Sequence, residues 1–260
     1  MKKQVDFESP PVIEVVLGVS FSRLEKFMIP HFGGYWKSLS GEFTKIEDQP
    51  PIVGENRDFA ETTIPSRVWF SNDAGTRLIQ LQQDRFIFNW RRQDGDPNEY
   101  PEFSKIFPEF VAAFSHFQDF LSKEKIAEDV AVEGLELTYV NIIKFDSIHC
   151  CVQRPGDAFV DHRRDVSRER FLPEVQDFSW VSVYEMPKQM GKLSVDAKSA
   201  KLSVSPKARV IRLLLTAKGA PASFDDDGFQ MWFDCAHDQI VNGFADITDE
   251  SVQRRVWGKR

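Results

Sequence analysis

Cysteine is scarce in this chain, which has 3 in 260 residues, and two of them, Cys150 and Cys151, are adjacent. No C-x-x-C pair occurs, so the sequence lacks the framework of a disulfide-rich secreted domain and suits a reducing compartment. The N-terminus also lacks the apolar core of a signal peptide, because its two lysines are followed by Asp6, Glu8 and a pair of prolines. No apolar run approaches the roughly 20 residues of a membrane helix. We therefore expect a cytoplasmic protein without a membrane partner.

An excess of positive charge is missing as well. The chain carries 33 basic and 40 acidic residues, a net charge of −7, which disfavours nucleic-acid or membrane binding driven by overall charge. A basic run at Arg163, Arg164, Arg168 and Arg170 is interleaved with acidic residues, which is typical of a solvated helix face. Tyrosine is rare, with 4 residues against 23 phenylalanines. Because phenylalanine has no polar group, most of these rings should pack in a core or an interface.

Metal-binding patterns are absent from the sequence. Histidine and cysteine gather in two regions, but neither region has the ligand spacing of a zinc site. These residues are His149, Cys150, Cys151 and His162 in the first region, and Cys235 and His237 in the second. The acidic run at residues 225–228 lacks the distal glutamate of a calcium loop, so a solvated loop explains it. We therefore predict no metal site and no cofactor.

Motifs for nucleophilic or phosphate chemistry are missing too, since neither G-x-S-x-G nor a phosphate-cradling glycine pattern occurs. Cys235 and His237 are two residues apart, which on a helix places them on different faces. Asp234 and Asp238 would share a helix face, but a solvated face or a helix cap explains that spacing. We therefore predict no catalytic residue, and the sequence favours a non-enzymatic role.

The most informative stretch is residues 77–92, RLIQLQQDRFIFNWRR, which predicts a β-hairpin that turns at Asp84-Arg85. In that register Gln80 lies opposite Asn89. Successive side chains of a strand alternate between the two sheet faces, so the hairpin has one apolar face and one mixed face. The apolar face is a predicted core and holds Ile79, Leu81, Phe86, Phe88 and Trp90. The second face holds Leu78, Gln80, Gln82, Ile87, Asn89 and Arg91.

The second face provides the candidate binding site. Gln80, Asn89 and Arg91 project from it together, and amide and guanidinium groups on rigid strands can bind carboxylates, phosphates or a peptide. Further members of the site would be Glu14 and the pair Glu136 and Thr138, if their strands face the same way. A solvated face of an antiparallel sheet shows the same alternation, so both interpretations stay open.

The remaining pattern predicts an α+β protein. Runs of strands between isolated helices indicate a mainly antiparallel β-sheet with long amphipathic helices packed on one face. In the first half we expect a strand over 12–21, a helix over 30–45, a connector over 48–65, a strand over 67–70, the hairpin, and a helix over 103–125.

The second half is similar to the first, with a loop in place of the first helix, so we expect one domain built from two similar halves, 12–130 and 131–260. A strand over 133–145 is followed by an irregular, mobile loop over 147–177. The elements expected after it are strands over 180–186, 192–195, 201–204 and 210–217, a helix over 234–244, and a last helix over 248–257 with Thr248 as its N-cap.

Four separated segments occur in the order SPPVIEVVLGVSF, RVWFSNDAGTRLIQLQQDRFIFNWRR, LELTYVNII and FDCAHDQIVNGFADIT. In these segments the chain resembles an uncharacterised, sporadically distributed prokaryotic protein family. The resemblance implies a bacterial or archaeal cytoplasmic protein but carries no established activity. Patchy distribution is typical of horizontally moved genes, such as those of defence or toxin–antitoxin islands.

The sequence therefore favours a binding protein that engages another protein or a second copy of itself. The alternative is a small-ligand sensor or an enzyme that uses Gln80, Asn89 and Arg91, with Glu14 or Glu136 as the carboxylate. Nucleic-acid binding is disfavoured by the acidic total.

Overall fold

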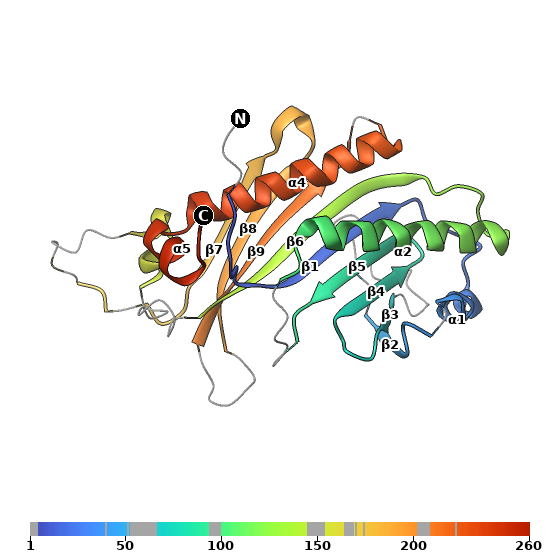
Figure 1. The fold of residues 1–260 in the computed structure, drawn as a ribbon, viewed down its shortest axis with the longest axis horizontal. Helices are drawn as coiled ribbons and strands as arrows, with labels where there is room; N and C mark the ends of the chain where they lie inside the picture. Colours follow the sequence, from blue (N-terminus) through green and yellow to red (C-terminus); the bar gives the residue numbers. More distant parts are fainter. Residues whose placement is uncertain are drawn as a thin grey trace. The chain divides into compact units, whose positions relative to one another are not determined.

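The structure, a computed structural model, describes residues 5–39, 41–50, 52, 67–93, 100–144, 154–163, 169, 171–173, 175–201, 209–221 and 223–260. These residues form nine strands and four α-helices, and the fold is α+β with an antiparallel β-sheet, as predicted (Figure 1). The chain divides into two compact units. The central unit contains residues 14–136, and the terminal unit contains residues 1–13 and 137–260.

In the central unit five strands pair in the order β2-β3-β4-β5-β1, with every neighbour antiparallel. They are β1 (Val12–Phe21), β2 (Lys45–Gln49), β3 (Arg67–Ser71), β4 (Arg77–Gln82) and β5 (Arg85–Arg91). The alternating apolar pattern predicted β1 with the bounds that the structure gives. Strand β2 includes Lys45, the last residue of the predicted helix 30–45, and the start of the predicted connector 48–65, so that part of the prediction is wrong.

The predicted hairpin is β4 and β5, but its turn lies at Gln83-Asp84 and its register differs by two residues from the prediction. Leu81 pairs with Phe86 and Ile79 with Phe88. The end of β1 and the chain just after it hold this turn, because the carbonyl groups of Asp84 and Gln83 accept hydrogen bonds from the backbone N–H groups of Phe21 (3.0 Å) and Leu24 (2.8 Å). Since the side-chain period is two, a slip of two residues leaves every side chain on its predicted face.

Two helices cover the apolar face of this sheet. The phenylalanine spacing of α2 (Phe103–Lys123) aims Phe114 and Phe117 at Phe86, with ring centroids 5.5 and 5.4 Å away. Helix α1 (Ile29–Ser38) adds Tyr35, whose ring meets Phe117 edge-on. It ends earlier than predicted because Gly41 adopts a positive φ of 79° and the chain then enters β2.

In the terminal unit four strands pair in the order β6-β9-β8-β7. They are β6 (Val132–Lys144), β7 (Ser179–Glu185), β8 (Lys192–Lys201) and β9 (Arg209–Gly219). The strands predicted at 192–195 and from residue 201 form one continuous strand, so among the described residues three strands rather than four follow β6. Residues 202–204 of that prediction lie outside the described residues.

Within the predicted loop 147–177, the short 3-10 helices η2 (Pro155–Asp157) and η3 (Val160–His162) occur. Residues 147–153, 164–168, 170 and 174 of this loop lie outside the described residues. A third 3-10 helix, η4 (Pro187–Gln189), stands between β7 and β8.

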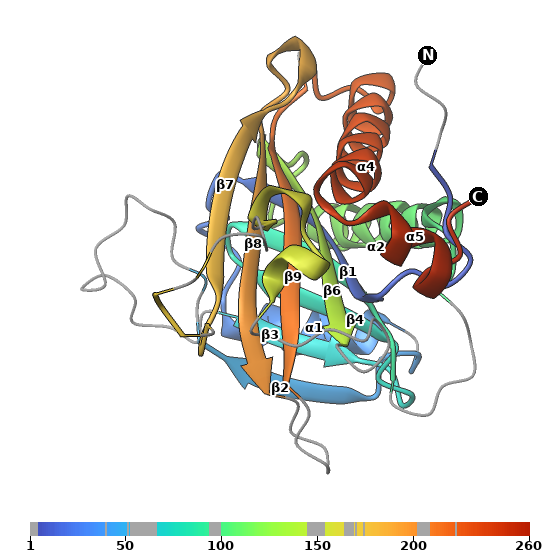
Figure 2. The same cartoon turned by 90° about the vertical axis from the view of Figure 1, so that its left-hand side faces the viewer.

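Helix α4 (Asp226–Ile247) is twice as long as predicted, because the acidic run that resembled a loop is its first turn. The Asp225 side chain caps the helix by accepting from the backbone N–H of Gly228 at 2.7 Å. Negative charge at Asp226 and Asp227 complements the positive end of the helix dipole. The helix lies along the sheet of its own unit (Figure 2), where buried Trp232 donates to the carbonyl of Met190 at 2.8 Å.

The predicted cap of the last helix is wrong by one residue. Thr248 closes α4, since its hydroxyl donates to the carbonyl of Phe244 at 2.6 Å. Asp249 caps α5 (Glu250–Val256) by accepting from the backbone of Val252 at 3.0 Å. Among the described helices, none is both long enough and apolar enough to cross a bilayer.

Candidate functional site

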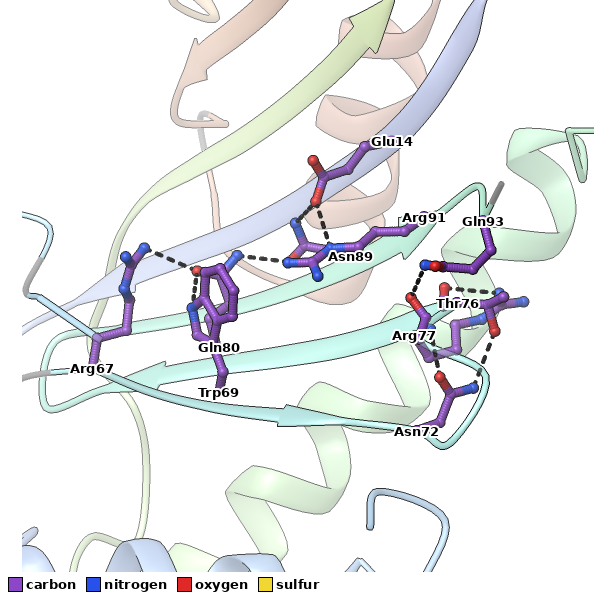
Figure 3. A network of polar contacts seen from close by, with 11 residues as sticks. Glu14, Arg67, Trp69, Asn72, Thr76, Arg77, Gln80, Asn89, Arg91 and Gln93 are labelled. Atoms are coloured by element: carbon purple, nitrogen blue, oxygen red, sulfur yellow. Dashed lines mark hydrogen bonds and ion pairs between the residues drawn. The ribbon is translucent and has the colours of Figure 1, made fainter. Parts of the chain in front are cut away.

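Four predicted site residues meet on the second face of the central sheet (Figure 3). Glu14 of β1 pairs with Arg91 of β5, and a chain of side-chain hydrogen bonds runs from there across β5 to β4. Glu14 Oε1 accepts from Arg91 Nε at 3.1 Å and from Asn89 Nδ2 at 2.7 Å. Asn89 Oδ1 in turn accepts from Gln80 Nε2 at 2.8 Å. The structure thus brings Glu14, Gln80, Asn89 and Arg91 into one network.

Two further members of the network come from β3, and the sequence analysis missed both. Gln80 Oε1 accepts from Trp69 Nε1 at 2.9 Å and from Arg67 Nη1 at 3.0 Å. The guanidinium carbon of Arg91 lies 4.9 Å from the centroid of the Trp69 ring, and that of Arg67 lies 5.4 Å from it. Alternation along 67–71 could have placed Arg67 and Trp69 on one face, but only the register with β4 shows that this face is the one of Gln80.

Burial decides between the two interpretations of this face. Gln80 is 7% exposed and Asn89 is 2% exposed, so the interpretation as a solvated sheet face is wrong for both amides. Their polar atoms bond to one another and to Trp69, Arg67 and Glu14, as buried polar groups in native proteins do. The two amides therefore hold the strands together, and the charged groups that reach solvent are the side chains of Arg91 (28% exposed) and Glu14 (25% exposed).

Another arginine, Arg85, stands on the same face but apart from these bonds. It pairs with Gln82 of β4 and with Ser20 of β1. Within the part of the chain that the structure describes, the Nε atoms of Arg67 and Arg85 are buried and have no acceptor. Burial, together with the positive charge of Arg85, lowers the pKa of Arg67.

Glu136 and Thr138 lie in different places. A Cβ atom on Gly18 would be 3.5 Å from that of Glu136, so Glu136 stands beside the middle of β1. Thr138 is buried in the terminal unit, where its hydroxyl lies 2.9 Å from that of Thr216. Thr138 therefore forms a hydrogen-bonded pair with Thr216, whereas the network of Glu14 lies in the central unit.

The residues weighed for metal or nucleophilic chemistry are also dispersed. On α4 the half-buried thiol of Cys235 has its pKa raised by burial, and Asp234 and Asp238 are exposed. His237 Nδ1 lies 2.9 Å from the hydroxyl of Tyr139, and burial lowers the pKa of His237 to about 4.

His149, Cys150 and Cys151 lie outside the described residues. Among those described, no three His, Cys, Asp or Glu side chains gather where they could hold a metal ion. In the basic run, Arg163 pairs with Asp249, whereas Arg164, Arg168 and Arg170 lie outside the described residues.

The terminal sheet presents a second candidate site along strand β7. This strand pairs with β8 alone among the described strands and forms the end of the order. Val181 and Val183 project from one face and are 60% and 57% exposed, and Tyr184 is 43% exposed. Just before the strand, Phe171 is 99% exposed and Leu172 is 63% exposed. Five of the large exposed hydrophobic side chains therefore fall between residues 171 and 184.

The strand at the end of the central sheet is built differently. Strand β2 has the sequence KIEDQ, and Lys45, Glu47 and Asp48 are exposed. Charged side chains along an edge strand oppose pairing with another chain. Strand β7 has no charged residue before Glu185, so it lacks that protection.

A scan against protein-family models finds no family that matches this chain, and a search of curated proteins finds no match.

Proposed function

We propose that this protein is a non-enzymatic interaction protein whose strand β7 pairs with an extended segment of a partner protein. The observation that carries the proposal is the series of exposed apolar side chains from Phe171 to Tyr184, on and next to an edge strand that has no proline and no charged residue before Glu185. A strand added to a sheet edge gains main-chain hydrogen bonds, and alternate side chains give it specificity. Val181 and Val183 offer β-branched partners for apolar residues at alternate positions of that segment.

The biological setting follows from the resemblance to a sporadically distributed prokaryotic family. We propose that the protein works in the cytoplasm as a component of a defence or toxin–antitoxin system. In such systems a protein that binds and holds another protein needs no catalytic residue. This agrees with the absence of a catalytic motif from the sequence.

The experiment compares two charge-introducing variants of the full chain. The double variant Val181→Lys, Val183→Lys changes exposed side chains on β7 and should leave folding intact. The matched control is Ile46→Lys, which changes a 44% exposed side chain on the charged edge strand β2. Each tagged protein is purified from its native host, and co-purifying proteins are quantified by mass spectrometry.

We expect a stoichiometric partner with the wild type and with Ile46→Lys, and its loss from the β7 variant, because lysines on an edge strand oppose pairing. Pairing between two copies of β7 would appear instead as a dimer that the same variant converts to a monomer. A wild type that is monomeric and partner-free would contradict the proposal, and so would a partner that the β7 variant retains.

A second candidate function, a small-ligand sensor or an enzyme at Gln80, Asn89 and Arg91, has narrower support. The two amides already bond within the network, so only the partly exposed pair of Arg91 and Glu14 could meet a ligand directly. We retain this alternative for that pair alone.

We also infer that the two halves of the chain arose by a structural duplication. In support, strands β1 to β5 with α1 precede the long helix α2, and strands β6 to β9 precede the long helix α4. Each long helix carries a buried apolar stripe.

A further inference from the structure

On the second face of the central sheet, Arg67 and Arg85 rise on either side of one strand. Arg85 of β5 pairs with Gln82 of β4. On the other side of β4, Val68 pairs with Leu81, so Arg67 of β3 stands next to Gln82 in the same row. Because directly opposite side chains of antiparallel strands share a face, both arginines flank Gln82 on that face.

Neither guanidinium has an acidic partner in the part of the chain that the structure describes. Other arginines of this sheet do have acidic partners, since Arg91 forms an ion pair with Glu14 and Arg77 forms one with Glu109 of α2. Arg67 instead bonds the neutral amide oxygen of Gln80. The nearby carboxylate of Asp84 accepts from Gln82 Nε2 at 3.0 Å.

Among the described residues, the Nε atom of each of these two arginines is a buried donor without an acceptor. A buried donor with no acceptor is costly, and two like charges held close together add to that cost. The lowered pKa of Arg67, caused by burial and by the charge of Arg85, reflects both effects. An anion with several oxygen atoms would supply acceptors for both Nε donors and would also neutralise the positive charge of the two arginines.

We propose that Arg67 and Arg85 form a binding site for a doubly charged oxyanion, such as the phosphate group of a small ligand. The planar fork of a guanidinium matches the oxygen geometry of phosphate and binds it through two parallel hydrogen bonds. Gln82 does not compete for the anion, because its amide is held by the backbone of Ile52 at 2.8 Å and by Asp84. The site lies in the central unit and is independent of the partner-binding role of β7.

The test titrates the purified full chain with inorganic phosphate at constant ionic strength, set with chloride, and measures binding by calorimetry. Thermal unfolding in the same solutions should show a Tm that rises with phosphate and saturates, as mass action requires of a ligand that binds the folded chain. Phosphate also stabilises proteins by exclusion from their surface, so only the saturable part reports the site. Acetate, with a single charge, should bind about tenfold or more weakly.

Three variants locate the site. Arg67→Gln and Arg85→Gln should each lose the saturable response, and Arg85→Lys, which keeps the charge but not the fork, should weaken it about tenfold. The matched control is Arg77→Gln, since that arginine already pairs with Glu109 and should leave phosphate binding unchanged. The proposal is overturned if the wild type shows no saturable binding, if acetate binds as tightly as phosphate, or if Arg77→Gln weakens binding as much as Arg67→Gln.

Discussion

Two buried tyrosines differ in whether their hydroxyl group has a hydrogen-bond partner. Tyr35 is fully buried among the rings of Phe70, Phe117 and Phe120, and its hydroxyl has no partner within the described part of the chain. Burial accordingly holds the pKa of Tyr35 far above its ordinary value. The hydroxyl of Tyr139, by contrast, lies 2.9 Å from His237 Nδ1.

We therefore predict opposite effects for the same chemical change at these two positions. Tyr35→Phe removes an unsatisfied buried hydroxyl and should raise the free energy of unfolding by about 1 kcal/mol. Tyr139→Phe removes a bonded hydroxyl and should lower it by about 1 kcal/mol. Urea denaturation of both variants measures the two changes. A loss of stability in Tyr35→Phe would show that its hydroxyl has an acceptor.

For individual residues, the sequence predicts some members of the candidate site, but it does not predict their cross-strand neighbours or their burial. Alternation along β1 and β5 places Glu14, Asn89 and Arg91 correctly, because the period of a strand is a local property. Arg67 and Trp69 enter through cross-strand pairing, which depends on which strands become neighbours. Arg85 follows the alternation of β5, but the predicted turn at Asp84-Arg85 left it outside the strand. The burial of Gln80 and Asn89 is likewise set by tertiary contacts. The alternating sequence pattern of a strand is the same whether its polar face is covered or exposed to solvent.

At the scale of elements, two glycines are expected to respond in opposite directions to alanine. Gly191 precedes β8 with a φ of 127°, and a Cβ atom there would lie 2.0 Å from the carbonyl oxygen of Lys218. Gly191→Ala should therefore lower the free energy of unfolding by more than the roughly 1–3 kcal/mol of backbone strain alone. Gly33 lies in α1, where a Cβ atom would have no atom of the described residues within 4 Å, so Gly33→Ala should raise the free energy of unfolding by about 1 kcal/mol.

Denaturant unfolding of the two glycine variants decides this prediction. If Gly191→Ala were as stable as the wild type, the close approach between the chain before β8 and the end of β9 would not exist in solution. If Gly33→Ala were destabilising, the helical assignment of α1 around the Gly33-Gly34 pair would be wrong, because alanine favours a helix over glycine.

The sequence analysis missed strand β2 and the first half of α4 for different reasons. Strand β2 is charged along its length, so only its pairing with β3 makes it a strand. The first half of α4 does carry a readable pattern, because Phe229, Trp232, Phe233 and Ala236 follow helical spacing. The run of aspartates before it concealed this pattern, since the same residues serve both turns and helix caps.

At the scale of the whole molecule, the class of fold follows from the order of strands and helices, whereas the strand order does not. Strands β6 and β9 are neighbours in the sheet although 64 residues separate Lys144 from Arg209. Local propensity carries no information on this pairing. The pairing of β6 with β9 depends on how the intervening chain, which includes β7 and β8, folds back. The division into a central and a terminal unit arises in the same way, since residues 1–13 join the second half of the chain.

The stability of the whole chain should also depend on pH through one largely buried histidine. Burial lowers the pKa of His237 to about 4, below the ordinary value of about 6.5, so the folded state keeps this side chain neutral while the unfolded state takes up a proton. Stability from this group is therefore complete above pH 6.5 and is lost as the pH falls towards 4, by on the order of 2–3 kcal/mol. Acidic groups add their own dependence, which a variant without the histidine shares.

The measurement is the free energy of unfolding of the wild type and of His237→Gln between pH 7.5 and about 4.5, at low protein concentration because the range crosses the sequence pI of about 5.4. We expect the wild type to lose more stability than the variant as the pH falls below 6.5. Tyr139→Phe should keep the wild-type slope, since burial rather than the tyrosine hydroxyl is the main cause of the lowered pKa of His237. Equal losses in the wild type and in His237→Gln would mean that His237 takes up its proton equally readily in the folded and the unfolded chain.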